Sequence, residues 1–231
     1  YKAYRALVRA KVSLFSMPAE ASPVQRAATL RQYRNYANLA ESYSTIPSRF
    51  LAITHGVSAV GKSSVSMRLV ESLGAIRIRS DVVRKKLFGN QESENAVGAG
   101  IYNAEASAVT YTKLHELAGI VLRAGFPVVL DATYLKRAQR DAAAKVAEAT
   151  GVPCLILDCT APDAVIEGWL AHRIAIGNDP SDATLEVVKA QQASREPLGA
   201  DEILRSKRVE THNSKSLDNL IADIRQRLPG L

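Results

Sequence analysis

The sequence of 231 residues has only two cysteines, and none of its apolar runs approaches the length of a membrane span. It also lacks a signal-peptide pattern at its start. Cys154 and Cys159 lie five residues apart in one predicted strand, so their side chains point to opposite faces and cannot bridge each other. We therefore expect buried, reduced thiols in a cytoplasmic protein that has no membrane partner.

A set of zinc ligands is also missing. The four histidines are His55, His115, His172 and His212. They show no metal-ligand spacing with one another or with cysteine, which disfavours a zinc site.

Basic charge is scarce in most of the chain, although the net charge is +7. Residues 1–49 hold eight Lys and Arg against two Glu, a net charge of +6, whereas residues 50–231 have a net charge of only +1. Aromatic residues make up 6% of the sequence and show no spacing suited to stacking bases. A nucleic-acid groove needs several basic residues and often a stacking platform. A nucleic-acid partner is therefore disfavoured.

The remaining composition is that of a globular α/β protein, with 47% hydrophobic residues and mixed charges. Five short runs suited to strands alternate with longer helical patterns. These runs are residues 50–54, 75–79, 128–130, 155–157 and 208–211. Strands that alternate with helices build a parallel sheet. The sequence therefore predicts a five-stranded, mostly parallel sheet with helices on both faces.

The first part of the chain has a different pattern. Residues 1–47 predict a helical segment of two amphipathic helices separated by a proline-containing break, and all the strands fall in residues 48–231. The second helix has a stripe of tyrosines, which we assign to packing. These are Tyr33, Tyr36 and Tyr43. We therefore expect a helical segment followed by one larger domain.

The stretch from Gly56 to Ser63 fits the P-loop pattern G-x-x-x-x-G-K-S/T, between a predicted strand and a predicted helix. In such a loop, backbone N–H groups at a helix N-terminus point at phosphate oxygens, and glycines leave room for that approach. Lys62 can reach the β- and γ-phosphates, and the Ser63 hydroxyl can ligate Mg²⁺. The predicted nucleotide-binding residues are Gly56, Val57, Ser58, Ala59, Val60, Gly61, Lys62, Ser63 and Ser64. A chance match is the alternative, but the flanking strand and helix favour the P-loop.

Two acidic residues directly follow predicted strands, at the edge where an open α/β sheet binds ligands. Asp81 follows the strand at 75–79 and is a candidate catalytic residue; alternatively, it caps the helix at 82–87. Asp131 follows the strand at 128–130 and is a candidate Mg²⁺ ligand; alternatively, it caps a loop. The sequence leaves both alternatives open.

A lid is predicted towards the end of the chain. The helical patterns at 162–176 and 183–195 are joined by a polar turn, and two helices in this place could cover the phosphates. Arg173 lies in the first helix and is a candidate catalytic residue. The alternative is an exposed surface arginine.

Four segments together resemble a family of P-loop kinases with an AAA-type ATP-binding domain. They are residues 56–63, 76–89, 129–133 and 194–198, and Arg79-Ser80-Asp81 with Arg84 is the most specific part. In that family the domain is commonly the C-terminal half of bifunctional proteins whose N-terminal half is similar to an aminoglycoside phosphotransferase. The resemblance implies that residues 1–45 are the last helices of such a half, which would explain the missing Met. More distantly, the domain is similar to polynucleotide kinase and zeta-toxin kinases.

The resemblance implies ATP and Mg²⁺ as cofactors, and it implies roles for single residues. Asp81 would accept the proton of the acceptor hydroxyl, and Arg84 would hold the acceptor. Asp131 and Thr133 would organise Mg²⁺ and the γ-phosphate. Arg140 stands where the family has an arginine, without an assigned role.

The chain departs from the family at two places. Ala59-Val60 replaces a Gly-Ser pair in the loop, which we expect to stiffen it. Trp169 and Ile176 stand where relatives have lid arginines, so Arg173 remains as the predicted lid arginine.

We therefore expect an ATP- and Mg²⁺-dependent kinase that phosphorylates a hydroxyl of a small metabolite, with sugars and aminoglycoside-like compounds as candidates. One alternative is a nucleotide-binding regulatory ATPase module. Asp81 and Arg84 favour the kinase, because a sensor needs no acid and arginine on the acceptor side. The other alternative, a polynucleotide 5′-hydroxyl kinase, is disfavoured by the near-neutral charge of residues 50–231.

Overall fold

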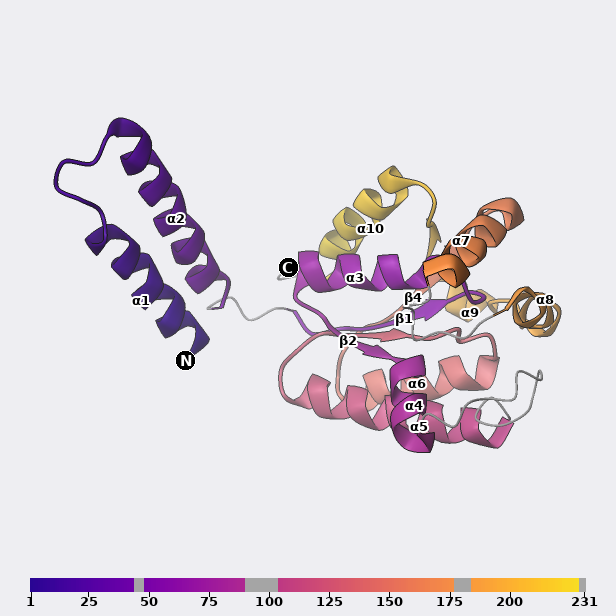
Figure 1. The fold of residues 1–231 in the computed structure, drawn as a ribbon. Helices are drawn as coiled ribbons and strands as arrows, with labels where there is room; N and C mark the ends of the chain where they lie inside the picture. Colours follow the sequence, from indigo (N-terminus) through magenta and orange to yellow (C-terminus); the bar gives the residue numbers. More distant parts are fainter. Residues whose placement is uncertain (44–47, 90–103, 177–183, 229–231) are drawn as a thin grey trace. The chain divides into compact units, whose positions relative to one another are not determined.

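The computed structural model of the chain describes residues 1–43, 48–89, 104–176 and 184–228, except the side chains of residue 104 and residues 173–176 (Figure 1). The chain divides into two compact units, Tyr1–Ile46 and Pro47–Leu231. The predicted loop between Gly89 and Gly100 and the predicted lid turn lie almost wholly outside the described residues.

The first unit is a hairpin of two helices, α1 (Lys2–Phe15) and α2 (Pro23–Ser42). The side chain of Ser22 accepts a hydrogen bond from the backbone N–H of Gln25, and the Gln25 side chain accepts one from Ser22, so α2 begins with a capping box. The buried apolar side chains in this unit are all alanines: Ala6, Ala10, Ala21 and Ala40. Tyr33 and Tyr43 remain 36% and 47% exposed and Tyr36 is half-buried, so the three tyrosines pack only in part within this unit.

The described residues of the second unit form a five-stranded parallel sheet in the order β2-β3-β1-β4-β5, which confirms the predicted fold class. The strands are β1 (Leu51–His55), β2 (Ile76–Arg79), β3 (Val128–Asp131), β4 (Cys154–Thr160) and β5 (Ser206–Glu210). The strand order reverses at β1, whose neighbours are β3 and β4. In a sheet of this kind, ligands bind beyond the carboxyl ends of the strands at such a reversal.

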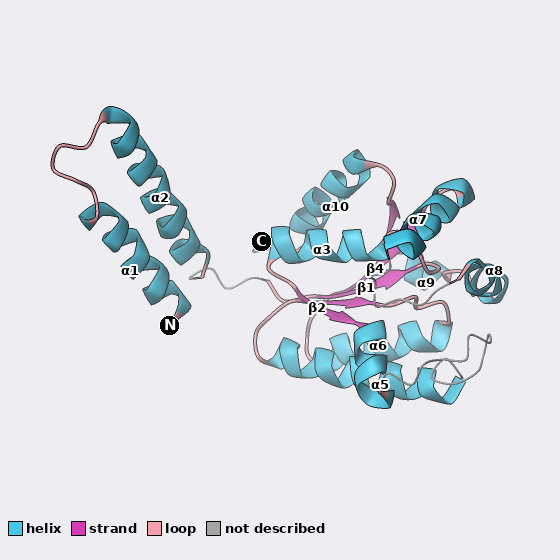
Figure 2. Cartoon of the chain, in the orientation of Figure 1, coloured by secondary structure: helices cyan, strands magenta, loops and turns pink. Residues whose placement is uncertain are grey.

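Helices cover both faces of the sheet, as Figures 1 and 2 show. They are α3 (Lys62–Leu73), α4 (Ser80–Phe88), α5 (Ala104–Arg123), α6 (Arg137–Ala149), α7 (Asp163–Ile176), α8 (Leu185–Ser194), α9 (Ala200–Ile203) and α10 (Ser214–Arg227). The helices α3 and α10 lie on one face, and α5 and α6 lie on the other. The short helix α9 is absent from the sequence prediction.

Two hydrophobic cores follow from the alternation of side chains along the strands. In β1, Leu51 and Ile53 pack towards α5 and α6, whereas Ala52 packs towards α3 and α10. The first three residues of β1 and of β3 are apolar and fully buried, as expected for parallel strands that are covered on both faces.

The two cysteines are free thiols, and Cys159 is buried whereas Cys154 is half-buried. Burial raises the pKa of Cys154 to about 11 and that of Cys159 to about 12. Neither thiol is a reactive thiolate at neutral pH. No helix among the described residues is both long and apolar enough to cross a membrane.

Candidate functional site

The P-loop connects the end of β1 to the start of α3, and its two glycines stand where no other residue fits. Gly56 and Gly61 have φ angles of +145° and +87°. A Cβ atom on Gly56 would lie 2.8 Å from the carbonyl oxygen of Cys159, and one on Gly61 would lie 2.8 Å from Cβ of Thr211. The sequence therefore needs glycine at both positions to form this loop.

Ala59 also has a left-handed conformation, with φ of +61°. For a residue with a Cβ atom, this conformation costs about 1 to 2 kcal/mol. The backbone of the loop is therefore strained at Ala59, and a glycine at this position would not be strained. The expected stiffening at Ala59 and Val60 remains a prediction.

Lys62 is nearly buried at the start of α3, with 9% of its surface exposed. Its Nζ donates a hydrogen bond to the carbonyl oxygen of Val57, 2.6 Å away. The side chain thus folds back across the loop, and its ammonium group lies beside the loop that would surround a phosphate. This arrangement suits a point charge acting on phosphate oxygens.

The structure brings Ser63 and Asp131 together, as their sequence positions led us to expect. The hydroxyl of Ser63 donates to Oδ2 of Asp131 at 3.2 Å, and the hydroxyl of Ser66 donates to the same oxygen at 3.1 Å. All hydrogen bonds to this carboxylate within the described residues come from side chains, which is not the pattern of a loop cap. A hydroxyl and a carboxylate at the end of a P-loop are the oxygen ligands that Mg²⁺ prefers. The residues present therefore fit a Mg²⁺ site.

Arg77 is a neighbour of Asp131 that the sequence did not single out. Its Nε and Nη2 atoms lie 2.9 Å and 2.5 Å from Oδ2 of Asp131. Strand β2 lies beside β3, so the side chain reaches across the parallel pair. A cation therefore already pairs with the candidate metal ligand.

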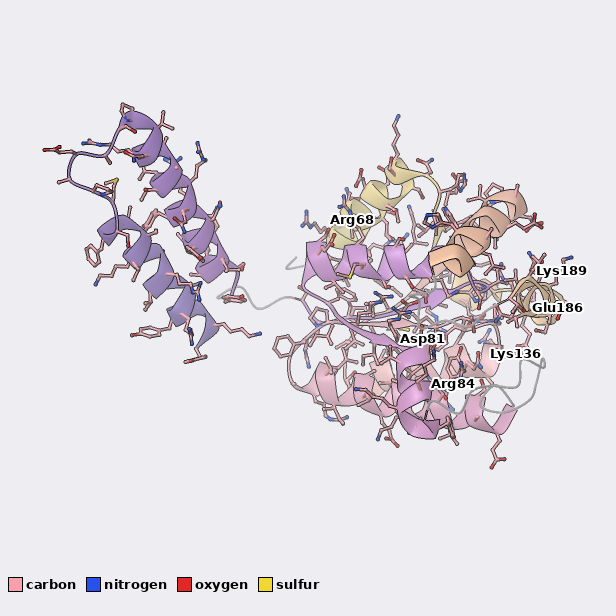
Figure 3. All side chains as sticks on the ribbon, in the orientation of Figure 1. Arg68, Asp81, Arg84, Lys136, Glu186 and Lys189 are labelled. Atoms are coloured by element: carbon pink, nitrogen blue, oxygen red, sulfur yellow. The ribbon has the colours of Figure 1, made fainter. Side chains whose placement is uncertain are left out.

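Asp81 is the second residue of α4, whereas the N-cap of this helix is Arg79. The interpretation of Asp81 as an N-cap is therefore wrong. Nε and Nη2 of Arg79 donate to the two carboxylate oxygens of Asp81 at 3.0 Å and 2.5 Å, and the Val82 backbone N–H donates to Oδ1 at 2.7 Å. Figure 3 shows Asp81 and Arg84 on the same helix.

Thr133 contacts Tyr111 of α5. The hydroxyl of Tyr111 is 3.1 Å from Oγ1 of Thr133 and accepts the backbone N–H of Tyr134, also at 3.1 Å. Burial raises the pKa of the Tyr111 hydroxyl, and the positive charge of the nearby Arg84 partly offsets that rise. The Tyr111 hydroxyl therefore joins the side chain of Thr133 to the backbone of Tyr134.

Tyr134 fixes the loop that follows β3. It is fully buried and has a φ of +45°, an unusual conformation for a tyrosine. Its carbonyl oxygen accepts hydrogen bonds from Nδ1 of His55 at 2.9 Å and from Nη1 of Arg140 at 3.1 Å. These bonds tie the end of β1 to the loop that contains Thr133.

Arg140, which had no role in the sequence analysis, is fully buried and paired with Glu202 of α9. Its Nε donates to Glu202 Oε1 at 2.6 Å and its Nη2 donates to Oε2 at 3.0 Å. Further bonds reach the carbonyl oxygens of Glu196 and Pro197 at 3.3 Å and 3.2 Å. Arg140 therefore fixes the segment after α8 against the loop after β3, and its partner Glu202 could not be identified from the sequence.

His55, Arg195 and Asp158 form a second network missed by the sequence analysis. Nε of Arg195 donates to Nε2 of His55 at 3.0 Å, and Nη2 of Arg195 donates to Oδ1 of Asp158 at 2.7 Å. Burial lowers the pKa of His55 and the charge of Arg195 adds to that effect, while the hydrogen bond to the Tyr134 carbonyl and the charge of Asp158 oppose it without cancelling it. A neutral ring with its proton on Nδ1 matches both of its hydrogen bonds. The network lies directly before Gly56, the first residue of the P-loop.

The predicted lid helices border the P-loop, although the side chain of Arg173 lies outside the described residues. The backbone N–H of Ser58 donates to Oε1 of Gln191 in α8, 2.7 Å away. In α7, the indole of Trp169 would lie 3.3 Å from a Cβ atom on Gly61. Both helices thus reach the loop, by residues that the sequence did not assign to it.

Comparisons with known proteins agree with this architecture. Residues 51–198 match the family described as an AAA domain. The chain is 31% identical over 201 residues to the uncharacterized protein Rv2004c of Mycobacterium tuberculosis, and the match covers 84% of this chain. It spans only 38% of the relative.

Solved structures of kinases are similar in fold. A sugar kinase from Janibacter sp. has a TM-score of 0.59 at 19% identity, over 79% of this chain and 98% of that one. The APS kinase CysC of Mycobacterium tuberculosis, in complex with AMPPNP and APS, has a TM-score of 0.54 at 19% identity, over 78% of this chain and 97% of that one. The family match extends over more than half of the sequence and includes the P-loop. The chain belongs to this AAA-domain family and has the fold of P-loop kinases.

Proposed function

We propose that the chain is an ATP- and Mg²⁺-dependent kinase that transfers the γ-phosphoryl group to a hydroxyl of a small metabolite. The observation that supports this most is the meeting of Ser63 and Asp131, 3.2 Å apart, at the P-loop. Phosphoryl transfer needs positioning and charge stabilisation more than covalent chemistry. A loop of N–H groups, a lysine and an oxygen-rich metal site provide both.

In this proposal, each group has a separate task. The P-loop N–H groups and Lys62 hold the phosphates, and Ser63 and Asp131 hold Mg²⁺ directly or through water. When bound, Mg²⁺ neutralises the negative charge of the β- and γ-phosphates. Asp81 accepts the proton of the acceptor hydroxyl and Arg84 holds the acceptor, with Thr133 near the γ-phosphate. Arg173 of α7 is proposed to neutralise charge from the lid.

The acceptor is proposed to be a small molecule. The sequence from residue 50 onwards has a net charge of +1, which does not suit a nucleic-acid strand. A sugar kinase and the APS kinase are similar in fold. Sugars and aminoglycoside-like compounds are therefore the first candidates.

One observation favours a second candidate, a nucleotide-binding regulatory module. Arg79 occupies both carboxylate oxygens of Asp81, so this carboxylate is engaged before any acceptor is present. If the Arg79–Asp81 pair persists when the nucleotide is bound, Asp81 does not act as a base. The chain would then bind ATP without transferring its phosphate.

We also propose that residues 1–47 pack against a further, phosphotransferase-like part of a longer protein. The support is the apolar surface of α1, where Leu7, Val12 and Phe15 are 55%, 53% and 75% exposed. Several exposed apolar side chains on one helix suit an interaction surface.

A screen of purified protein against hydroxylated metabolites tests the proposal. Thermal shift would detect binding of ATP with Mg²⁺ and of each metabolite, and ADP release would detect turnover. The kinase proposal expects one class of metabolite to raise ADP release well above the rate with ATP alone. Strong binding of ATP with no acceptor-dependent turnover would favour the regulatory module.

A further inference from the structure

The carboxylate of Asp131 is held almost entirely through one oxygen. Oδ2 accepts hydrogen bonds from Ser63, Ser66 and, twice, from Arg77. Within the described residues, Oδ1 accepts none. The carboxylate therefore has one fixed oxygen and one that stays available to a ligand.

The guanidinium of Arg77 is held beside Asp131 by burial and by hydrogen bonds. Asp131 and Arg77 have side chains only 5% and 17% exposed, so both charges are largely withdrawn from water. The guanidinium donates two hydrogen bonds to the same oxygen, which fixes its orientation more firmly than a single contact. Because Arg77 lies on β2 and Asp131 on the adjacent β3, the sheet itself sets their separation.

A guanidinium beside a metal ligand has two effects on a divalent cation. It orients the carboxylate, and its positive charge repels the incoming metal. Mg²⁺ loses its waters reluctantly and usually binds proteins through few carboxylates together with substrate phosphates. A site weakened by an arginine would therefore bind the metal chiefly when the nucleotide supplies additional oxygens.

We propose that Arg77 is a positioning residue of the Mg²⁺ site, which fixes Asp131 through Oδ2 and lowers the affinity of the site for a divalent cation. The inference rests on the proposed function, since it needs the metal to bind beside Asp131. Its consequence is that metal and nucleotide bind together, while the protein without nucleotide binds the metal weakly.

The chain offers a matched control. A groove of about 630 Å³ beside α3 and α10 is bordered by Ser63, Arg68 and Arg77. Arg68 pairs with Asp218 of α10 at 2.5 Å, and its side chain is 44% exposed. It has the same charge as Arg77 in the same groove, but the hydrogen bonds of Asp131 do not include it.

The experiment measures the binding of Mn²⁺ to the protein saturated with ADP, from the electron paramagnetic resonance signal of free Mn²⁺. Arg77→Gln removes the charge but keeps an amide that can donate to Asp131. Arg77→Met removes both, and Arg77→Lys keeps the charge. Arg68→Gln is the control. A circular dichroism spectrum of each variant checks that it is folded.

We expect Arg77→Gln and Arg77→Met to bind Mn²⁺ roughly 5- to 20-fold more tightly than the wild type, from the removal of one nearby positive charge. Arg77→Lys and Arg68→Gln should stay within about twofold of the wild type. A merely structural role for Arg77 would lower stability without tightening the metal site.

Two results would contradict the role of Arg77, and only one of them would also contradict the proposed kinase function. Unchanged or weaker Mn²⁺ binding by Arg77→Gln, beside normal binding by the wild type, overturns the role of Arg77 alone. If the wild-type protein with ADP binds no Mn²⁺, the metal-dependent kinase proposal fails together with it.

Discussion

The Nε–H group of Arg195 donates a hydrogen bond to Nε2 of the buried His55, 3.0 Å away, although 140 residues separate the two in sequence. The bond requires a lone pair on Nε2 and therefore a neutral ring. Protonation of His55 would place two cations in contact next to the P-loop. This relationship makes the stability of the protein sensitive to acid.

We predict that the free energy of unfolding decreases as the pH falls below about 6.5. Burial lowers the pKa values of His55 and His115 in the folded protein, so the unfolded chain takes up protons over a range where the folded protein does not. Each such histidine contributes a slope of up to about 1.4 kcal/mol per pH unit.

Urea unfolding at pH 7.5 and at pH 5.5 measures this effect. The loss of stability between the two pH values should be smaller in His55→Gln than in the wild type. His212→Gln, at an exposed position, should behave like the wild type. The same pH dependence in His55→Gln and wild type would exclude His55 as a source of the effect.

Arg140 and Glu202 are both fully buried, so removing one of them should leave the other as an unpaired buried charge. We expect Arg140→Met to lower the free energy of unfolding by about 3–5 kcal/mol. The double variant Arg140→Met/Glu202→Leu should recover part of that loss, because neither charge is then left behind.

A double-mutant cycle by chemical denaturation measures the coupling between Arg140 and Glu202. Arg68→Met is the control, because its pair with Asp218 is exposed to solvent on both sides, and it should cause a much smaller change. Additive effects of the two core substitutions would mean that the pair does not act as a unit.

The hydrogen bond from Ser58 to Gln191 joins α8 to the P-loop. We predict that Gln191→Ala raises the rate of amide hydrogen exchange at Ser58 by roughly tenfold in the nucleotide-free protein, because a bonded N–H becomes open. Gln192→Ala is a closely matched control, since the neighbouring glutamine bonds Asp163 instead. Hydrogen-exchange mass spectrometry of the P-loop peptide distinguishes the two variants. Equal protection of the Ser58 N–H in both variants would exclude a stabilising role for the Ser58–Gln191 hydrogen bond.

Asp81 has two remaining interpretations, as a base or as the partner of Arg79. If it accepts the proton of the acceptor, Asp81→Asn should lower phosphoryl transfer by roughly 10²–10⁴ and leave ATP affinity almost unchanged. Asp218→Asn, at an exposed ion pair, should retain normal transfer. Steady-state kinetics with an accepted metabolite distinguishes the two interpretations. A normal rate of transfer by Asp81→Asn would exclude Asp81 as the base and leave only its pairing with Arg79.

Local patterns in the sequence predicted the parts of the site that depend on neighbouring residues. The spacing of Gly56, Gly61 and Lys62 is a local signal, and the loop has the predicted place between β1 and α3. An apolar run that ends in Asp131 is equally local, and parallel pairing then brings such strand ends to one edge.

Partners from distant segments could not be predicted in this way. Arg77 and Asp131 are 54 residues apart, Arg140 and Glu202 are 62 apart, and Ser58 and Gln191 are 133 apart. Which of the 30 Lys and Arg residues meets which acid depends on strand order and loop path. The one-turn helix α9, which positions Glu202, is too short to leave a periodic pattern.

The boundary of α4 shows how a small shift changes an interpretation. The sequence prediction placed the start of the helix two residues late, at residue 82, which made Asp81 a plausible cap. In the structure the helix begins at Ser80, so the Asp81 side chain is within the first turn and pairs with Arg79. Helix ends are the least certain part of a sequence-based prediction.

We propose that the P-loop serves phosphoryl transfer to a small metabolite, and the most direct test is the activity of Lys62→Ala. The variant removes an ammonium group that bonds the loop carbonyl of Val57, and no large apolar side chain is lost from the core. The matched control is Lys189→Ala, an exposed lysine of α8 labelled in Figure 3.

The measurement is the transfer of labelled γ-phosphate from ATP at low salt, to a panel of sugars and amino sugars and, separately, to 5′-hydroxyl oligonucleotides. We expect labelling of a metabolite by the wild type and by Lys189→Ala, with transfer abolished in a folded Lys62→Ala protein and no efficient labelling of oligonucleotides. Transfer at the wild-type rate by folded Lys62→Ala, or efficient labelling of oligonucleotides that weakens steeply as salt rises, would contradict this proposal.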